Sequence, residues 1–215
     1  MDAILFDLDG TLTDSSIGIT RSLQHALRTL GHPVPEQTDL LWCIGPPMAA
    51  SLCTLLGGEA EVETAAALYR ARYGEVGIFE NAPYDGIVAM LTALKAAGKR
   101  LFVATSKPAV YAEPILVHFA LRPYFEAVFG AAPDGSLGDK TLLLGHALAQ
   151  LGLEGARCAM VGDRSFDMIG ARANGMTALG VLYGFGSAEE LQGAGAQYLC
   201  ATPQAVGEQF RALSH

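Results

Sequence analysis

Beyond residue 83 the chain alternates short apolar runs with segments of helical character. The apolar runs cover residues 100–105, 127–129, 158–161, 177–181 and 198–199. Strands that alternate with helices along a sequence build a parallel sheet whose two faces are covered by helices. The pattern therefore predicts an α/β fold with a three-layer, Rossmann-like parallel sheet core.

The first apolar run, residues 3–6, ends in two carboxylates, Asp7 and Asp9, which are followed by Gly10. A strand that continued through both acids would put them on one face, where they would repel each other. If the strand ends at Asp7, the glycine allows a turn, and the two acids reach different sides of a small pocket. Such crowding at a strand end suggests a bound cation. The alternative is an Asp-Gly turn that caps the following helix.

Residues 15–80 carry helical patterns only. Apolar positions recur at helical spacing in residues 15–31 and 59–73, and no strand-like run lies between them. The first strand is therefore followed by a helical block and not by a single crossover helix. We predict a core formed by residues 1–14 and 81–215, and an all-helical cap formed by the inserted residues 15–80.

Composition limits the class of protein. Hydrophobic residues make up 51% of the chain, yet no apolar run approaches the roughly 18 residues that span a membrane. An acidic strand stands where a signal peptide would have basic and then apolar residues. Cys43, Cys53, Cys158 and Cys200 are scattered without a CxxC pair, which favours free thiols in a reducing compartment. We expect a cytoplasmic protein.

The charge of the chain bears on its partners. A net charge of −8 with only four lysines argues against nucleic acid and anionic lipid. An anionic small molecule would need local attraction from a metal ion or from one well-placed lysine. For the oligomeric state, monomer and homodimer both stay open.

Polar side chains follow three of the predicted strands, in residues 7–13, 105–107 and 163–167. Sites in parallel sheets form beyond the carboxyl ends of the strands. If the sheet brings these ends together, one pocket holds four carboxylates, at least two hydroxyls and a lysine. Such a pocket suits phosphoryl transfer to or from a small phosphorylated metabolite.

These residue types suit a mechanism that passes through an aspartyl-phosphate intermediate. Oxygen atoms of Asp7 and Asp163, with one backbone carbonyl, suit Mg²⁺. Asp7 would attack phosphorus and form an aspartyl-phosphate intermediate. Asp9 would protonate the leaving oxygen and later activate water. Thr105 and the backbone amides after Asp9 would hold phosphate oxygens, and Lys140 would offset the crowded negative charge.

These residues lie in four ordered motifs. They are residues 6–15, the strand ending at Thr105, the helix beginning at Lys140, and residues 161–168. Together they resemble the motifs of the haloacid dehalogenase-like hydrolases over nearly the whole chain. Within that superfamily the chain is similar to the phosphoglycolate phosphatase group, which has a helical cap inserted after the first motif.

The resemblance departs from the family pattern at one place. The lysine motif reads Gly138-Asp139-Lys140 and not the commoner lysine-proline form, although residues 134–136 fit a close variant of the group.

The resemblance also implies a role for each matching position. Asp7 would be nucleophile and metal ligand, and Asp163 would be a second metal ligand. Asp9 would be the general acid and base, and its backbone carbonyl would also bind Mg²⁺. Asp167 would support the site. The residues that would bind phosphate are Gly10, Thr105, Ser106 and Lys140.

Some of these residues also have a purely structural interpretation, in which they take no part in the chemistry. Asp167, four residues after Asp163, would cap its helix. Lys140 would be a solvated lysine at a helix start. Lys107 has no partner that the pattern identifies, and it is best interpreted as a surface or hinge residue.

Residues of the cap are candidates for substrate selection. Arg21 would meet a second anionic group of the substrate, or it is a solvated helix residue. Gly45 and Pro46 belong to a rigid turn that would close over the pocket. No lysine precedes Lys95, which argues against a Schiff base formed from the cap, as used by the phosphonoacetaldehyde hydrolases of this superfamily. The presence of Asp9 disfavours a dehalogenase.

These observations favour a Mg²⁺-dependent phosphatase of small phosphomonoesters, with 2-phosphoglycolate or a nucleoside monophosphate as candidate substrates. A hexose-phosphate mutase would use the same aspartates but would have to exclude water from its pocket. A non-catalytic, phosphate-binding regulatory protein would have the same fold but would not hydrolyse phosphate esters.

Overall fold

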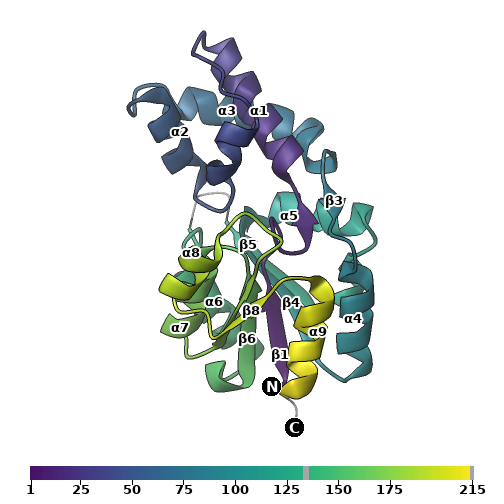
Figure 1. The fold of residues 1–215 in the computed structure, drawn as a ribbon. Coiled ribbons are helices and arrows are strands. Elements are labelled where there is room, and N and C mark those ends of the chain that lie inside the picture. Colours follow the sequence, from purple (N-terminus) through teal and green to yellow (C-terminus); the bar gives the residue numbers. More distant parts are fainter. Residues whose placement is uncertain (133–135, 214–215) are drawn as a thin grey trace. The chain divides into compact units, whose positions relative to one another are not determined.

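The computed structural model describes residues 1–132 and 136–213, and the chain divides into two compact units (Figure 1). Unit 1 consists of Met1–Thr13 and Pro83–His215, and unit 2 consists of Asp14–Ala82. Two short strands, β2 (Thr13–Asp14) and β3 (Ala82–Pro83), pair where the chain passes from one unit to the other. The role of unit 2 as a cap stays a prediction.

Unit 1 is built on a six-stranded sheet in the order β5-β4-β1-β6-β7-β8, with all neighbouring strands parallel. The predicted α/β class is confirmed. The strands are β1 (Ala3–Phe6), β4 (Arg100–Pro108), β5 (Ala127–Ala131), β6 (Cys158–Gly162), β7 (Thr177–Val181) and β8 (Tyr198–Cys200).

Helices cover both faces of this sheet. Leu5, Phe102 and Met160 pack in one cluster with apolar residues of α6 and α7, and α4 and α9 lie at the opposite face (Figure 1). This arrangement buries β1 completely, as a near-continuous apolar central strand requires. The helices of unit 1 are α4 (Ile87–Ala96), α5 (Ala109–His118), α6 (Lys140–Leu151), α7 (Ser165–Ala173), α8 (Ala188–Gly193) and α9 (Pro203–Ala212), with 3₁₀ turns η3 (Arg122–Tyr124) and η4 (Gly155–Arg157).

Strand β4 is longer than its apolar pattern predicts. The sequence indicates an end at Thr105, but β4 continues through Pro108, with a shift of register against β5 between these two residues. At Gly130 of β5 an added Cβ would lie 2.7 Å from the carbonyl oxygen of Lys107, so this close approach requires glycine. The extension carries the segment 105–108 along the edge where the site forms.

Unit 2 is helical, as predicted for its sequence. It contains α1 (Ser16–Thr29), η1 (Thr38–Cys43), α2 (Met48–Leu56), α3 (Val62–Glu75) and η2 (Gly77–Phe79). Buried apolar residues of α1 and α3, among them Leu23, Leu27 and the stacked rings of Tyr69 and Tyr73, form its interior. All four cysteines of the chain are free thiols, as predicted.

Glu80 ties two helices of unit 2 together. Its carboxylate accepts hydrogen bonds from Arg72 at 2.8 and 3.1 Å and from Arg21 at 2.8 Å. The hydrogen bond from Arg72 is the main cause that lowers the pKa of Glu80, and burial opposes it. Arg21 is thus engaged in an ion pair, and its contact with substrate stays a prediction.

Glu80→Gln is expected to destabilise the protein at neutral pH by about 1 kcal/mol, because it removes an ionic acceptor shared by two arginines. A carboxylate whose folded pKa is lowered adds stability above its unfolded pKa, and loses it as the pH falls through the folded value. The difference between wild type and variant in urea unfolding should therefore shrink in acid. Glu63→Gln is the control, since Glu63 pairs with Arg70 at the surface. A pH-independent difference would contradict this account.

Candidate active site

The order of strands brings the three polar strand ends together. β1 lies between β4 and β6, and Phe6 is in register with Val103 and with Val161. Asp7 therefore emerges between the end of β6, which leads to Asp163, and the segment of β4 that holds Thr105. This is the carboxyl edge at which sites of open α/β sheets form.

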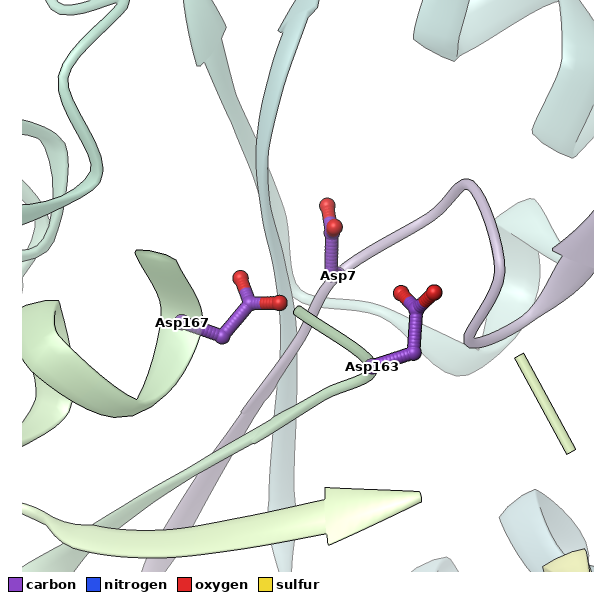
Figure 2. Close-up of side chains that lie close together, drawn as sticks. All are labelled: Asp7, Asp163 and Asp167. Carbon is purple, nitrogen blue, oxygen red and sulfur yellow. The ribbon is translucent and has the colours of Figure 1, made fainter. Parts of the chain in front are cut away.

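Three carboxylates form the centre of this edge. Oxygen atoms of Asp7, Asp163 and Asp167 all lie within 4.8 Å of one another, and all three residues are buried. Figure 2 shows Asp7 and Asp163 just beyond their strands and Asp167 on the first turn of α7. The carboxylate of Asp9 is not a member of this group. The binding of a metal ion by the backbone carbonyl of Asp9 stays a prediction.

Lys140 neutralises part of this charge. Its ammonium lies 3.1 Å from Asp7 Oδ1 and 2.8 Å from Asp167 Oδ1, and it donates to the carbonyl oxygen of Ala104 at 3.0 Å. Burial lowers the pKa of Lys140, but the charges of Asp167 and Asp7 outweigh it, so the pKa is raised overall. Asp139, at the departure from the family pattern, is the N-cap of α6 and accepts from Leu142 N–H. It fixes the helix start that presents Lys140.

Asp163 is held by its surroundings. Thr11 donates from its hydroxyl to Oδ1 at 3.2 Å, and the N–H of Phe185 donates to Oδ2 at 2.8 Å. An added Cβ would lie 2.1 Å from Asp163 Oδ2 at Gly10 and 2.4 Å from Asp163 Cβ at Gly184. These glycines are required for close packing around the carboxylate, a function that their positions in the sequence do not reveal.

The donor set fits a divalent cation. Burial, followed by the charges of Asp167 and Asp7, raises the pKa of Asp163 well above its ordinary range. Burial likewise raises the pKa of Asp167, against the lowering effect of Lys140. Three carboxylates with one ammonium leave an excess of buried negative charge, which a hard cation with oxygen ligands would compensate. Asp7 and Asp163 are the predicted ligands, and the position of Asp167 adds a third candidate.

Asp167 serves the local backbone as well as the cluster. It lies in the first turn of α7, and its Oδ2 accepts from the N–H of Arg164 at 3.1 Å, while Oδ1 faces Lys140. Oδ2 therefore fits the predicted capping role of Asp167, and Oδ1 fits its predicted supporting role in the site.

Lys107 is not the surface or hinge residue that its sequence context indicates. It is buried, and its Nζ lies 2.9 Å from Asp9 Oδ2. The interpretation was wrong because the ion pair joins residues 98 positions apart on β4 and on the loop after β1, a separation that no local pattern reveals. The regular strand pattern also ends before Lys107, which hides the extension that carries it.

The predicted phosphate-binding residues lie along the same edge. Thr105 is buried, and its hydroxyl accepts from the N–H of Lys107 at 3.2 Å. Ser106 is half-buried, and Gly10 has a φ of 81°, which favours glycine. Their contact with phosphate stays a prediction. Of residues 134–136, which fit a close variant of the group, residues 134 and 135 lie outside the described part of the chain.

The predicted cap residues belong to unit 2. Gly45 has a φ of 105° and lies with Pro46 between η1 and α2, so the turn expected there is present. Whether it closes over a substrate stays a prediction. None of the helices in the described part of the chain has the length and apolar character that crossing a bilayer requires.

Comparison with known proteins supplies the family. Residues 4–181 match the haloacid dehalogenase-like hydrolase model. The chain is 45% identical over 199 residues to a 5′-nucleotidase of Pseudomonas aeruginosa, with 92% of this chain and 90% of that protein covered. It is 34% identical over 203 residues to the phosphoglycolate phosphatase of Caulobacter vibrioides, with 87% and 81% covered.

Another relative is longer than this chain. The tyrosine-protein kinase PtkA of Mycobacterium tuberculosis is 47% identical over 186 residues, which cover 86% of this chain but only 64% of that protein. Among solved structures, a predicted phosphatase from Clostridium acetobutylicum has a TM-score of 0.94 at 40% identity, with 98% of both chains covered. The chain belongs to the haloacid dehalogenase-like hydrolases, in the phosphoglycolate phosphatase-like group.

Proposed function

We propose that the protein is a Mg²⁺-dependent phosphatase of small phosphomonoesters that acts through an aspartyl-phosphate intermediate on Asp7. The observation that carries the proposal is the separation of the two motif aspartates. Asp7 lies in the carboxylate cluster with Lys140, whereas Asp9 is paired with Lys107 outside it. Two acids with different partners suit two different roles in one reaction.

The first half-reaction transfers the phosphoryl group to the enzyme. An oxygen of Asp7 attacks phosphorus and forms the acyl-phosphate bond, while the phosphorus–oxygen bond of the ester breaks. The departing oxygen takes a proton from Asp9 and leaves as the alcohol. Lys140, Thr105 and backbone amides near Gly10 bind the non-bridging oxygens.

The second half-reaction returns the enzyme to its starting state. Asp9 accepts a proton from water, which attacks phosphorus and releases inorganic phosphate from Asp7. Ser106 would complete the phosphate-binding edge. Mg²⁺, held by Asp7, Asp163 and the Asp9 carbonyl with support from Asp167, would neutralise phosphate charge when bound.

Relatives suggest which esters to test first. The relative from Pseudomonas aeruginosa, at 45% identity, is named a 5′-nucleotidase. The relative from Caulobacter vibrioides, at 34% identity, is named a phosphoglycolate phosphatase. We therefore propose nucleoside monophosphates as the first candidate class and 2-phosphoglycolate as the second.

The proposal is tested by measuring free phosphate released with Mg²⁺ from nucleoside monophosphates, 2-phosphoglycolate, sugar phosphates and phosphotyrosine. We expect release from at least one of the first two classes. Isomerised sugar phosphate without free phosphate would instead identify a mutase. Binding of phosphate esters without any turnover across the panel would identify a regulatory protein and would overturn the proposal.

A further inference from the structure

The carboxylate of Asp9 is held on one side only. Lys107 Nζ lies 2.9 Å from Oδ2, and the side chains of Lys107 and Asp9 are 6% and 12% exposed. The other oxygen, Oδ1, is buried and accepts no hydrogen bond from any described residue. A buried carboxylate oxygen without a donor is costly, which makes it a candidate for a functional group.

The backbone that carries Lys107 is itself fixed. Its N–H donates to Thr105 Oγ1 at 3.2 Å, and its carbonyl approaches Gly130 too closely for any other residue at that position. A long lysine side chain has several rotamers, but one that is 6% exposed and starts from a constrained backbone has few of them available.

We propose that Lys107 is the positioning residue of the general acid. It anchors Asp9 Oδ2, so that Oδ1 is the oxygen that gives its proton to the leaving group and takes one from water. Lys107 also keeps the Asp9 carboxylate apart from the cluster of Asp7, Asp163 and Asp167. The ammonium group that pairs with this cluster belongs to Lys140. This inference rests on the proposed role of Asp9 and adds a residue outside the four motifs.

The inference predicts a leaving-group-dependent defect. The value of kcat/KM reports steps up to departure of the alcohol, and an alkoxide needs the acid far more than a nitrophenolate does. We expect Lys107→Met to lower kcat/KM by about 10²-fold for an alkyl phosphate and by less than about 3-fold for p-nitrophenyl phosphate. Lys107→Arg should recover part of the alkyl activity. Lys95→Met is the control, since Lys95 is exposed and donates to the Pro123 carbonyl.

A double variant tests whether Lys107 acts through Asp9. In an Asp9→Asn background, Lys107→Met should cause no further loss with the alkyl ester. Equal losses for both esters, additive losses in the double variant, or no loss at all would each overturn the inference.

Folding and the basal reaction are checked separately. Thermal unfolding and near-UV circular dichroism establish that each variant is folded. If Lys107→Met does not fold, Lys107→Arg carries the test, with a smaller but still leaving-group-selective loss expected. If the wild type hydrolyses no phosphate ester, including those of the panel given above, the proposed phosphatase function falls and this inference with it. Hydrolysis by the wild type with an unselective variant overturns this inference alone.

Discussion

Asp7→Asn is expected to reduce kcat/KM for every hydrolysed ester by at least about 10⁴-fold, because the amide cannot form the acyl-phosphate bond. The change keeps the shape of the side chain and removes one negative charge from a buried cluster of three. The folded state should therefore persist, and only turnover should be lost. Phosphate release and thermal unfolding are measured on the same preparation.

The first strand offers a matched control for this prediction. Asp2 precedes β1 at its amino end, as Asp7 follows it at its carboxyl end, and Asp2 is half-exposed at 44%. Asp2→Asn should leave kcat/KM within about 2-fold of the wild type, since surface substitutions rarely disturb a site. Full activity in the Asp7 variant would refute the assignment of the nucleophile. Acid-quench trapping of phosphate on the wild type, absent from Asp7→Asn, would support it directly.

Removal of divalent cations by a chelator is expected to abolish turnover, and added Mg²⁺ to restore it. The physical reason is the excess negative charge of the carboxylate cluster, which would repel the phosphate dianion if no cation were present. Restoration should follow a saturable dependence on Mg²⁺. Activity that persists after exhaustive chelation would contradict a role for the metal.

Asp163→Asn separates loss of metal binding from loss of chemistry. We expect the Mg²⁺ concentration for half-maximal activity to rise by at least about 10-fold, because a buried ionic ligand becomes neutral. Asp85→Asn, at an exposed position before α4, should leave that concentration unchanged. An Asp163 variant with unaltered Mg²⁺ dependence would exclude this residue as a ligand.

Much of the fold was predictable because its signals are local. Each strand of the sheet is a short apolar run bounded by helical segments, and this pattern is independent of which strands become neighbours. The extent of β4 was not predictable, because the ladder beyond Thr105 depends on the register shift against β5 and on the small residue at Gly130. Where the residues of a strand do not mark its end, the pairing with the neighbouring strand determines where it ends.

The carboxylate residues of the candidate site were predictable for a similar reason. Asp7 and Asp163 follow apolar strands directly, and the carboxyl ends of parallel strands share one edge. The arrangement of the lysines was not. Lys140 and Lys107 lie on different elements, α6 and β4, and sequence spacing carries no information about which aspartate each one faces.

The sequence by itself determined the class of fold, the helical insertion and the aspartates that stand at strand ends, because these depend on residue type and local periodicity. Only the tertiary structure decided that Asp7 and Asp167 share Lys140 while Asp9 pairs with Lys107. Buried ion pairs form between groups that folding brings together from distant positions, and their geometry depends on the packing of the whole sheet.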